Sequence, residues 1–102
     1  MGIPEILSTE PIVTQATTEA GKVSVSFWAE AKVLGKHRHM EVANVVLYPG
    51  YGCRIRVHPC PIGWADRAFG VYKQLQAHGE TDEKPTHEVS WRLGYPQFRP
   101  LV

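Results

Sequence analysis

The sequence predicts an α+β domain: an antiparallel sheet of four to five strands with one helix, at about residues 66–78, packed on one face. Residues 23–33 and 53–58 alternate apolar and polar side chains, which is the period of a strand with one buried face. Residues 66–78 instead repeat apolar side chains at helical spacing. Segments rich in Gly and Pro separate these stretches, as is typical of turns.

Length and composition are those of an ordinary globular domain. The chain has 102 residues, 43% hydrophobic and 21% charged, which fits a single domain over 1–102. We expect an N-terminal arm over 1–9, an acidic loop over 79–85 and a C-terminal tail over 96–102. No stretch approaches the roughly 18 apolar residues of a membrane span, and no leader is visible. We therefore expect no membrane contact and a cytoplasmic location.

The first two strands are expected at residues 11–18 and 23–33. The earlier segment is rich in Val, Ile and Thr and suits a short edge strand. In the later segment the odd-numbered residues, such as Val25 and Phe27, are apolar and should face the core. Trp28 belongs to the even-numbered set, so we expect it to be exposed on the opposite face.

The next strand, residues 38–48, is apolar on both of its faces from Val42 to Tyr48, apart from Asn44. Such a strand needs cover on both sides, from a helix, an arm or another subunit. Together with an exposed Trp28, this pattern predicts a homodimer. Residues 53–58 then alternate again, with the arginines directed outward.

Residues 66–79 predict the helix. Asp66 is the expected N-cap and Gly79 the residue that ends the helix. The apolar face comprises Ala68, Val71, Tyr72 and Leu75. In the alternative, residues 68–77 form a strand that pairs with 86–95, which would make an all-β sandwich or small barrel. Residues 88–95 are the expected last strand, ended by Pro96 and Pro100.

Two surfaces are candidates for binding. Aromatic side chains between helix and sheet would line a pocket for a small apolar ligand: Trp64, Phe69, Tyr72, Trp91 and Tyr95. The outer sheet face would carry an interaction surface made of Trp28, Arg54, Arg56, His58 and Arg92. A second copy is the favoured partner of this face, because a net charge of +1 is small for a nucleic-acid binder. Weak binding of single-stranded nucleic acid through Trp28 and the three arginines is the alternative.

Two further groups of residues raise an enzymatic alternative. His37, His39 and Glu41 would point to one side of a strand, and two imidazoles with a carboxylate are a ligand set for Fe(II) and related metals. Neighbouring basic residues disfavour a cation there, so we expect no metal and no cofactor. Cys60 with His58 is a weaker thiol alternative, and Cys53 is expected in the core. The favoured function is a small binding or interaction domain, more consistent with a non-enzyme than with an enzyme.

Overall fold

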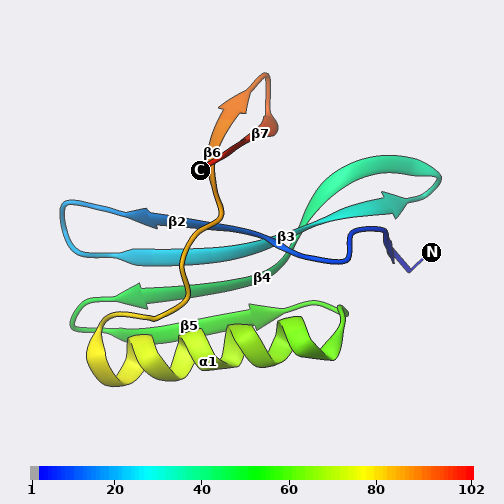
Figure 1. Cartoon of the computed structure of the whole chain (residues 1–102). Helices are drawn as coiled ribbons and strands as arrows, with labels where there is room; N and C mark the ends of the chain where they lie inside the picture. Colours follow the sequence, from blue (N-terminus) through cyan, green and yellow to red (C-terminus); the bar gives the residue numbers. More distant parts are fainter. Residues whose placement is uncertain (1–2) are drawn as a thin grey trace.

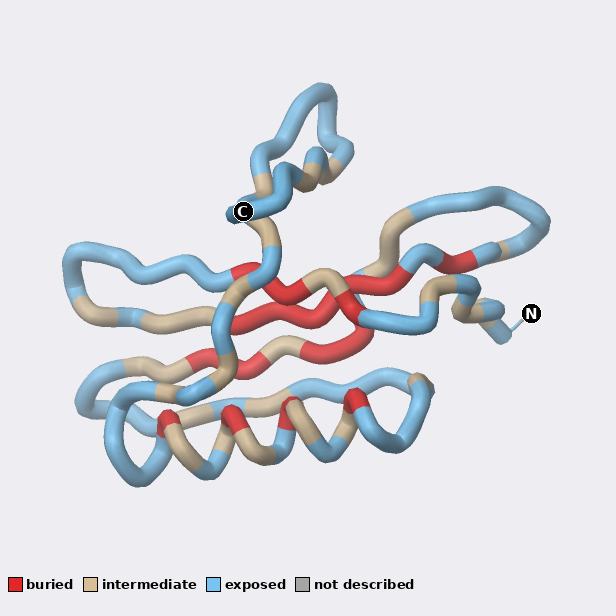
Figure 2. The backbone as a smooth tube through the Cα atoms, viewed as in Figure 1, coloured by how far each residue is buried: buried red, intermediate tan, exposed pale blue. Residues whose placement is uncertain are grey.

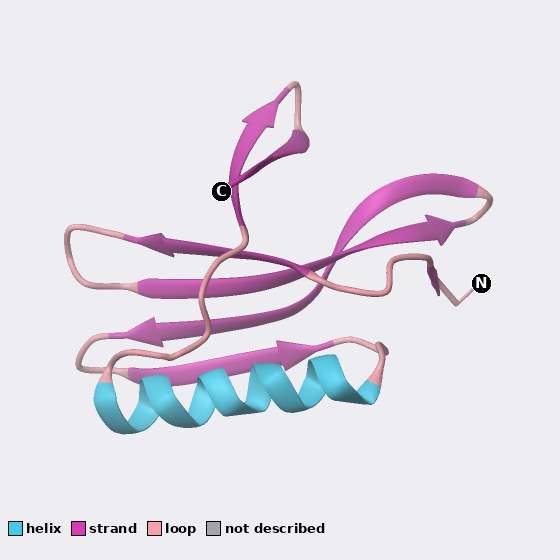
Figure 3. Cartoon of the chain, viewed as in Figure 1, coloured by secondary structure: helices cyan, strands magenta, loops and turns pink. Residues whose placement is uncertain are grey.

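The computed structural model describes residues 3–102, which form seven strands and one helix (Figures 1 and 3). This confirms the α+β class. The elements in chain order are β1 (Glu5–Ile6), β2 (Ile12–Thr17), β3 (Val23–Val33), β4 (Lys36–Tyr48), β5 (Gly52–Val57), α1 (Ile62–His78), β6 (His87–Arg92) and β7 (Tyr95–Pro100).

The main sheet is antiparallel and is built around the long β3–β4 hairpin. β5 pairs with the free edge of β4, while β1 and β2 both pair with the other edge of β3. β2 follows the first half of β3, and β1 extends the N-terminal arm along its second half, at Lys32 and Ala31. β6 and β7 form a separate hairpin, which stands at the opposite end of the molecule from α1 (Figure 1).

A β-bulge explains the apolar run in β4. Phe27 lies opposite Ala43, but Trp28 lies opposite Glu41, so Val42 is an extra residue on β4. The bulge shifts the alternation by one residue, which lets both Val42 and Ala43 be buried. Part of the Val42–Tyr48 segment, which the sequence predicted to need cover on both faces, is therefore buried by the chain itself without a second subunit.

The helix begins four residues earlier than the sequence suggested. Pro61 precedes it, with φ −52° and ψ 139°, and makes no side-chain cap, so Asp66 is not the N-cap. Proline suits the start of a helix because its missing N–H has no acceptor in the first turn. Gly79 ends α1 as expected: its φ is 75° and its N–H donates to the Leu75 carbonyl at 2.9 Å. The helical state of this segment also rules out the all-β alternative.

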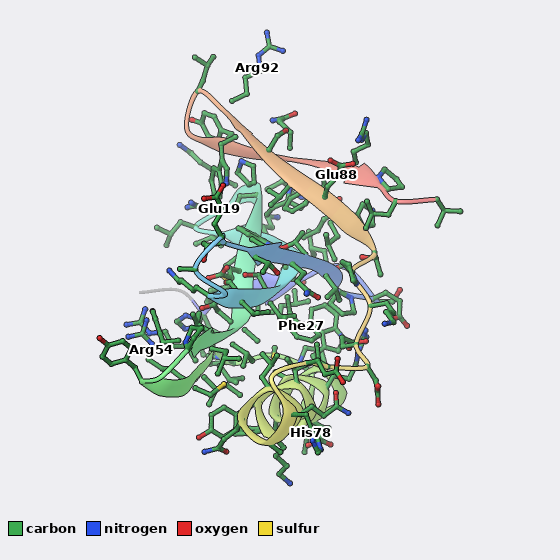
Figure 4. The ribbon with its side chains drawn as sticks, turned by 90° about the vertical axis from the view of Figure 1, so that its left-hand side faces the viewer. Glu19, Phe27, Arg54, His78, Glu88 and Arg92 are labelled. Carbon is green, nitrogen blue, oxygen red and sulfur yellow. The ribbon has the colours of Figure 1, made fainter. Side chains whose placement is uncertain are left out.

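The core lies between α1 and one face of the sheet, here called the inner face (Figure 2). The helix contributes four buried residues at spacings of four and three: Trp64, Ala68, Val71 and Leu75. Phe27 on β3 has no exposed surface and lies between sheet and helix (Figure 4). The Arg67 guanidinium lies 5.6 Å from the centre of its ring.

The C-terminal segment differs from the expected single strand and tail. Leu93 and Gly94, with φ of 51° and 82°, form a two-residue turn that folds residues 87–100 into a hairpin. Residues flanking such a turn form a hydrogen-bonded pair, and the pairs alternate from there. Pro96 and Pro100 therefore take positions whose N–H would point away from β6, so neither proline interrupts the ladder.

Candidate functional site

Trp28 is covered by the β6–β7 hairpin, which corrects the expectation that it is exposed. Only 8% of its surface is accessible, and its indole Nε1–H donates to the Thr14 hydroxyl at 2.9 Å. The rings of Trp91 and Phe98 contact it edge-on, at centroid distances of 6.0 and 5.3 Å. Because Trp28 and Phe27 point to opposite faces of β3, the hairpin packs on the outer face, opposite α1.

The end of this hairpin carries three exposed large apolar side chains. Trp91, Leu93 and Tyr95 are 62%, 89% and 70% exposed, and Arg92 lies between them in sequence. These four residues are here called the hairpin tip. Arg92 extends away from the body of the protein, at the end opposite His78 of the helix (Figure 4).

The five residues of the aromatic pocket expected between helix and sheet do not converge in the structure. Trp64 is part of the core, Tyr72 is half-buried against it, and Phe69 is 46% exposed on α1. Trp91 and Tyr95 belong to the hairpin on the other face of the sheet. Helical periodicity placed Tyr72 on the packed side of α1, but it did not place Trp64 or Phe69. Nothing in the sequence indicated the face on which the C-terminal hairpin packs.

A groove of about 580 Å³ lies instead at the C-terminal end of α1, between the helix, the β2–β3 end and the loop 79–85. Apolar side chains from three segments contribute to its lining: Val23, Leu75 and Pro85. The loop is tied to the helix, since the Gln74 side-chain oxygen accepts the Asp82 N–H at 2.7 Å. Glu80 is an exposed carboxylate at this groove.

The structure does not bring the three residues of the metal alternative together. His37, His39 and Glu41 follow one another along one side of β4. The His39 side chain contacts other residues: its ring centre lies 4.8 Å from that of Phe98, and its Nε2 lies 4.0 Å from a Glu30 carboxylate oxygen. Alternate residues of a strand stand about 6–7 Å apart, too far for three ligands to meet without a neighbouring element. Residues 3–102 contain no group of three His, Cys, Asp or Glu side chains placed to hold a metal ion.

The residues expected to form one interaction face on the outer side of the sheet do not lie together in the structure. Arg54 and Arg56 are exposed on the outer face of β5, followed by exposed His58. Trp28 is buried, and Arg92 lies at the hairpin tip, well separated from Arg54 (Figure 4). The alternation of β5 predicted the outward arginines, whereas grouping them with Arg92 assumed a strand order that the structure does not have.

Three residues absent from the sequence-based set lie near Arg54 in the structure or shortly before it in the chain: Lys22, Tyr48 and Tyr51. The Nη2 of Arg54 donates to the Tyr48 hydroxyl at 3.0 Å, and the guanidinium carbon of Arg54 lies 5.6 Å from the Tyr48 ring centre. Lys22 Nζ approaches the same ring at 5.3 Å. Tyr51, in the β4–β5 turn, is 94% exposed. The surface formed by Lys22, Tyr48, Tyr51, Arg54 and Arg56 is here called the basic patch.

Polar side chains adjoin the basic patch on the same outer face. The Asn44 amide donates to the hydroxyls of Ser24 at 3.1 Å and Ser26 at 2.9 Å. Asn44 lies directly opposite Arg56 in the β4–β5 ladder. These hydrogen bonds between β3 and β4 thus fix the conformation of the polar side chains beside the arginines.

The two cysteines are free thiols in half-buried positions. Burial raises the pKa of both Cys53 and Cys60, and a backbone hydrogen bond at Arg54 only partly opposes this for Cys53. A raised pKa lowers the fraction of thiolate, which is the nucleophilic form. Burial therefore lowers the nucleophilic fraction of both thiols at neutral pH.

We expect both thiols to react with iodoacetamide several-fold more slowly at pH 8 in the folded protein than in protein unfolded by guanidinium. Because burial raises each pKa above its ordinary value of 9.0, the rate should reach half of its maximum at a higher pH in the folded protein than in the unfolded chain. Mass spectrometry of quenched samples measures each site. Equal rates in the two states would contradict this protection.

Comparison of the chain with known protein families, curated proteins and solved structures gives no match. Within the described residues, no helix is long and apolar enough to cross a lipid bilayer. The structure defines the class as a small α+β antiparallel-sheet domain with a protruding aromatic hairpin.

Proposed function

We propose that the chain is a small binding domain that acts by docking its hairpin tip on a second copy of the same chain. The observation that carries this proposal is the exposure of three large apolar side chains at one end of the hairpin, Trp91, Leu93 and Tyr95, at 62%, 89% and 70%. Trp91 lies on the face of the hairpin that meets Trp28, and Tyr95 lies on the opposite face, so a partner would have to enclose the tip from both sides. Large apolar side chains grouped on a surface are characteristic of interaction sites. Trp, Tyr and Arg are also the residues that most often dominate the binding energy of interfaces.

The tip is suited to binding because it is held in a defined orientation. The two-residue turn at Leu93 and Gly94 restricts the backbone, and one edge of Trp91 rests on Trp28. Across the hairpin, Arg99 donates to the carboxylate of Glu88. A preformed loop loses less conformational entropy when it binds, which favours association.

A second copy is the partner favoured by the groove at the end of α1. Val23 and Pro85 offer the tip partly exposed apolar surface, beside polar residues that include Glu80, Glu83 and Lys84. Glu80 takes part in none of the ion pairs found within residues 3–102, and Arg92 supplies the opposite charge on the tip. Reciprocal docking of tip into groove would give a closed twofold dimer. The earlier grounds for a dimer, Trp28 and the β4 run, no longer support it, because the chain itself covers Trp28 and part of the run.

Light scattering tests this proposal. We expect a mass near twice 11.4 kDa at high protein concentration. The variant Trp91→Ser/Tyr95→Ser should weaken the dimer by about 30-fold or more, the loss expected when interface anchors are removed. Ile62→Ser/Phe69→Ser removes two exposed apolar side chains from α1 instead and should leave the mass unchanged.

Charge reversal tests the groove as the docking site. Arg92→Glu and Glu80→Arg should each weaken the dimer, and the double variant should recover most of the lost affinity because the pair is restored with opposite sense. A wild-type monomer at high concentration, or a dimer indifferent to the tip variant, would overturn the proposal. Failure of the double variant to recover would overturn docking in this groove.

A further inference from the structure

The basic patch concentrates positive charge that the chain does not neutralise. Lys22 and Arg54 both approach the ring of Tyr48, and Arg56 follows two residues later on the same face of β5. The ion pairs within the described residues involve His39, Arg67 and Arg99, and none of the three cations of the patch. The negative face of the Tyr48 ring offsets part of their repulsion. An anionic ligand would offset the remainder.

We propose that the basic patch binds the phosphates of single-stranded nucleic acid. Alternate residues on one face of a strand stand about 6–7 Å apart, so Arg54 and Arg56 form a row along β5. A row of cations suits a chain of phosphates better than one isolated anion. Arginine is also the side chain whose planar group pairs with phosphate through two hydrogen bonds.

Tyr51 provides the second element of this recognition. It lies in the β4–β5 turn, three residues before Arg54 in the chain, and is 94% exposed, so its ring is open for stacking. Both cations at Tyr48 already occupy the space around that ring, which leaves Tyr51 as the base platform. Stacking on an aromatic side chain requires an unpaired base, which a single strand offers and an intact duplex does not.

Because the net charge of the chain is only +1, the attraction of nucleic acid should come from the basic patch and not from the protein as a whole. Four of the ten acidic residues, Glu80, Asp82, Glu83 and Glu88, lie in or after the loop that follows α1. Glu19 lies in the same β2–β3 turn as Lys22 but forms no ion pair with it. Affinity should therefore come from few phosphates and depend strongly on salt. This inference is independent of the hairpin tip and of the dimer.

Fluorescence anisotropy with a labelled single-stranded oligonucleotide tests the proposal at low salt. Arg54→Ala/Arg56→Ala should weaken binding at least 10-fold. The same variant should reduce the slope of log affinity against log salt by about 1.4, because each phosphate that an arginine neutralises on a single strand adds about 0.7 to that slope. Tyr51→Ala should weaken binding about 10-fold, since the base then has no ring on which to stack. Lys36→Ala/Arg38→Ala removes the same charge from the other end of β4 and should change affinity less than twofold.

The outcomes separate this ligand from others. Binding that is absent at low salt, or abolished equally in the two double variants, would overturn the proposal. A duplex bound as tightly as the single strand, or a Tyr51→Ala protein of unchanged affinity, would overturn the role of stacking and with it the single-stranded ligand. Full displacement of the oligonucleotide by equimolar inorganic phosphate would point to a small-anion site instead.

Discussion

Trp28→Ala is expected to lower the free energy of unfolding by about 3–5 kcal/mol and to release the β6–β7 hairpin from the sheet. The substitution removes a side chain that is 8% exposed and lies against Trp91 and Phe98. At the base of the hairpin, the Thr86 N–H and hydroxyl still bond to the backbone of Val13, so the hairpin remains attached at that end. Only the packing on the outer face is removed.

Two measurements distinguish this effect from general destabilisation. Urea unfolding followed by circular dichroism gives the stability, and hydrogen exchange gives the protection of residues 87–100 relative to α1. Trp28→Phe keeps an aromatic ring but leaves the buried Thr14 hydroxyl without its donor, and should cost about 1–3 kcal/mol with the hairpin still docked. If hairpin and helix lose protection in parallel in Trp28→Ala, Trp28 does not anchor the hairpin.

Phe27→Ala should be equally destabilising, by about 3–5 kcal/mol, but should affect the sheet and helix together. Phe27 has no exposed surface, faces the helix side of β3 and carries the Arg67 guanidinium over its ring. The cavity would lie within the core formed by α1 and the central strands. We expect a lower midpoint of urea unfolding with an unchanged slope.

Phe69→Ala is the matched control, because it removes the same ring from a site that is 46% exposed on α1. It should cost well under half as much, since less apolar surface is removed from burial. Should Phe27→Ala fail to fold, Phe27→Leu keeps most of the volume and should lower stability by about 1–1.5 kcal/mol. A destabilisation at Phe27 no larger than that at Phe69 would contradict the placement of Phe27 in the core.

Local periodicity was sufficient to predict the layers of the domain. Alternation in β3 identified Phe27 as inward, and the helical spacing of Ala68, Val71 and Leu75 identified the packed face of α1. Alternation specifies the face on which a side chain lies but carries no information on what covers that face. Trp28 was therefore predicted as exposed, because its cover comes from a hairpin about 60 residues later in the chain.

The β6–β7 hairpin was not predicted from the sequence because proline was taken to end the strand. Proline disrupts strand pairing only at positions whose N–H would donate to the neighbouring strand. Pro96 and Pro100 look like the end of regular structure until the turn at Leu93 and Gly94 sets the register. The basic patch was half predicted for a similar reason. Arg54 and Arg56 follow from alternation within β5, whereas the approach of Lys22 to Tyr48 depends on how residues of separate segments meet across the sheet.

The two prolines of β7 also limit how this protein can self-associate. The free edge of β7 lacks the N–H donors that other residues would supply at Pro96 and Pro100, so another chain finds few partners there for adding a strand. The fold can therefore display Trp91, Leu93 and Tyr95 to solvent without templating the edge-to-edge aggregation that exposed, apolar strands invite.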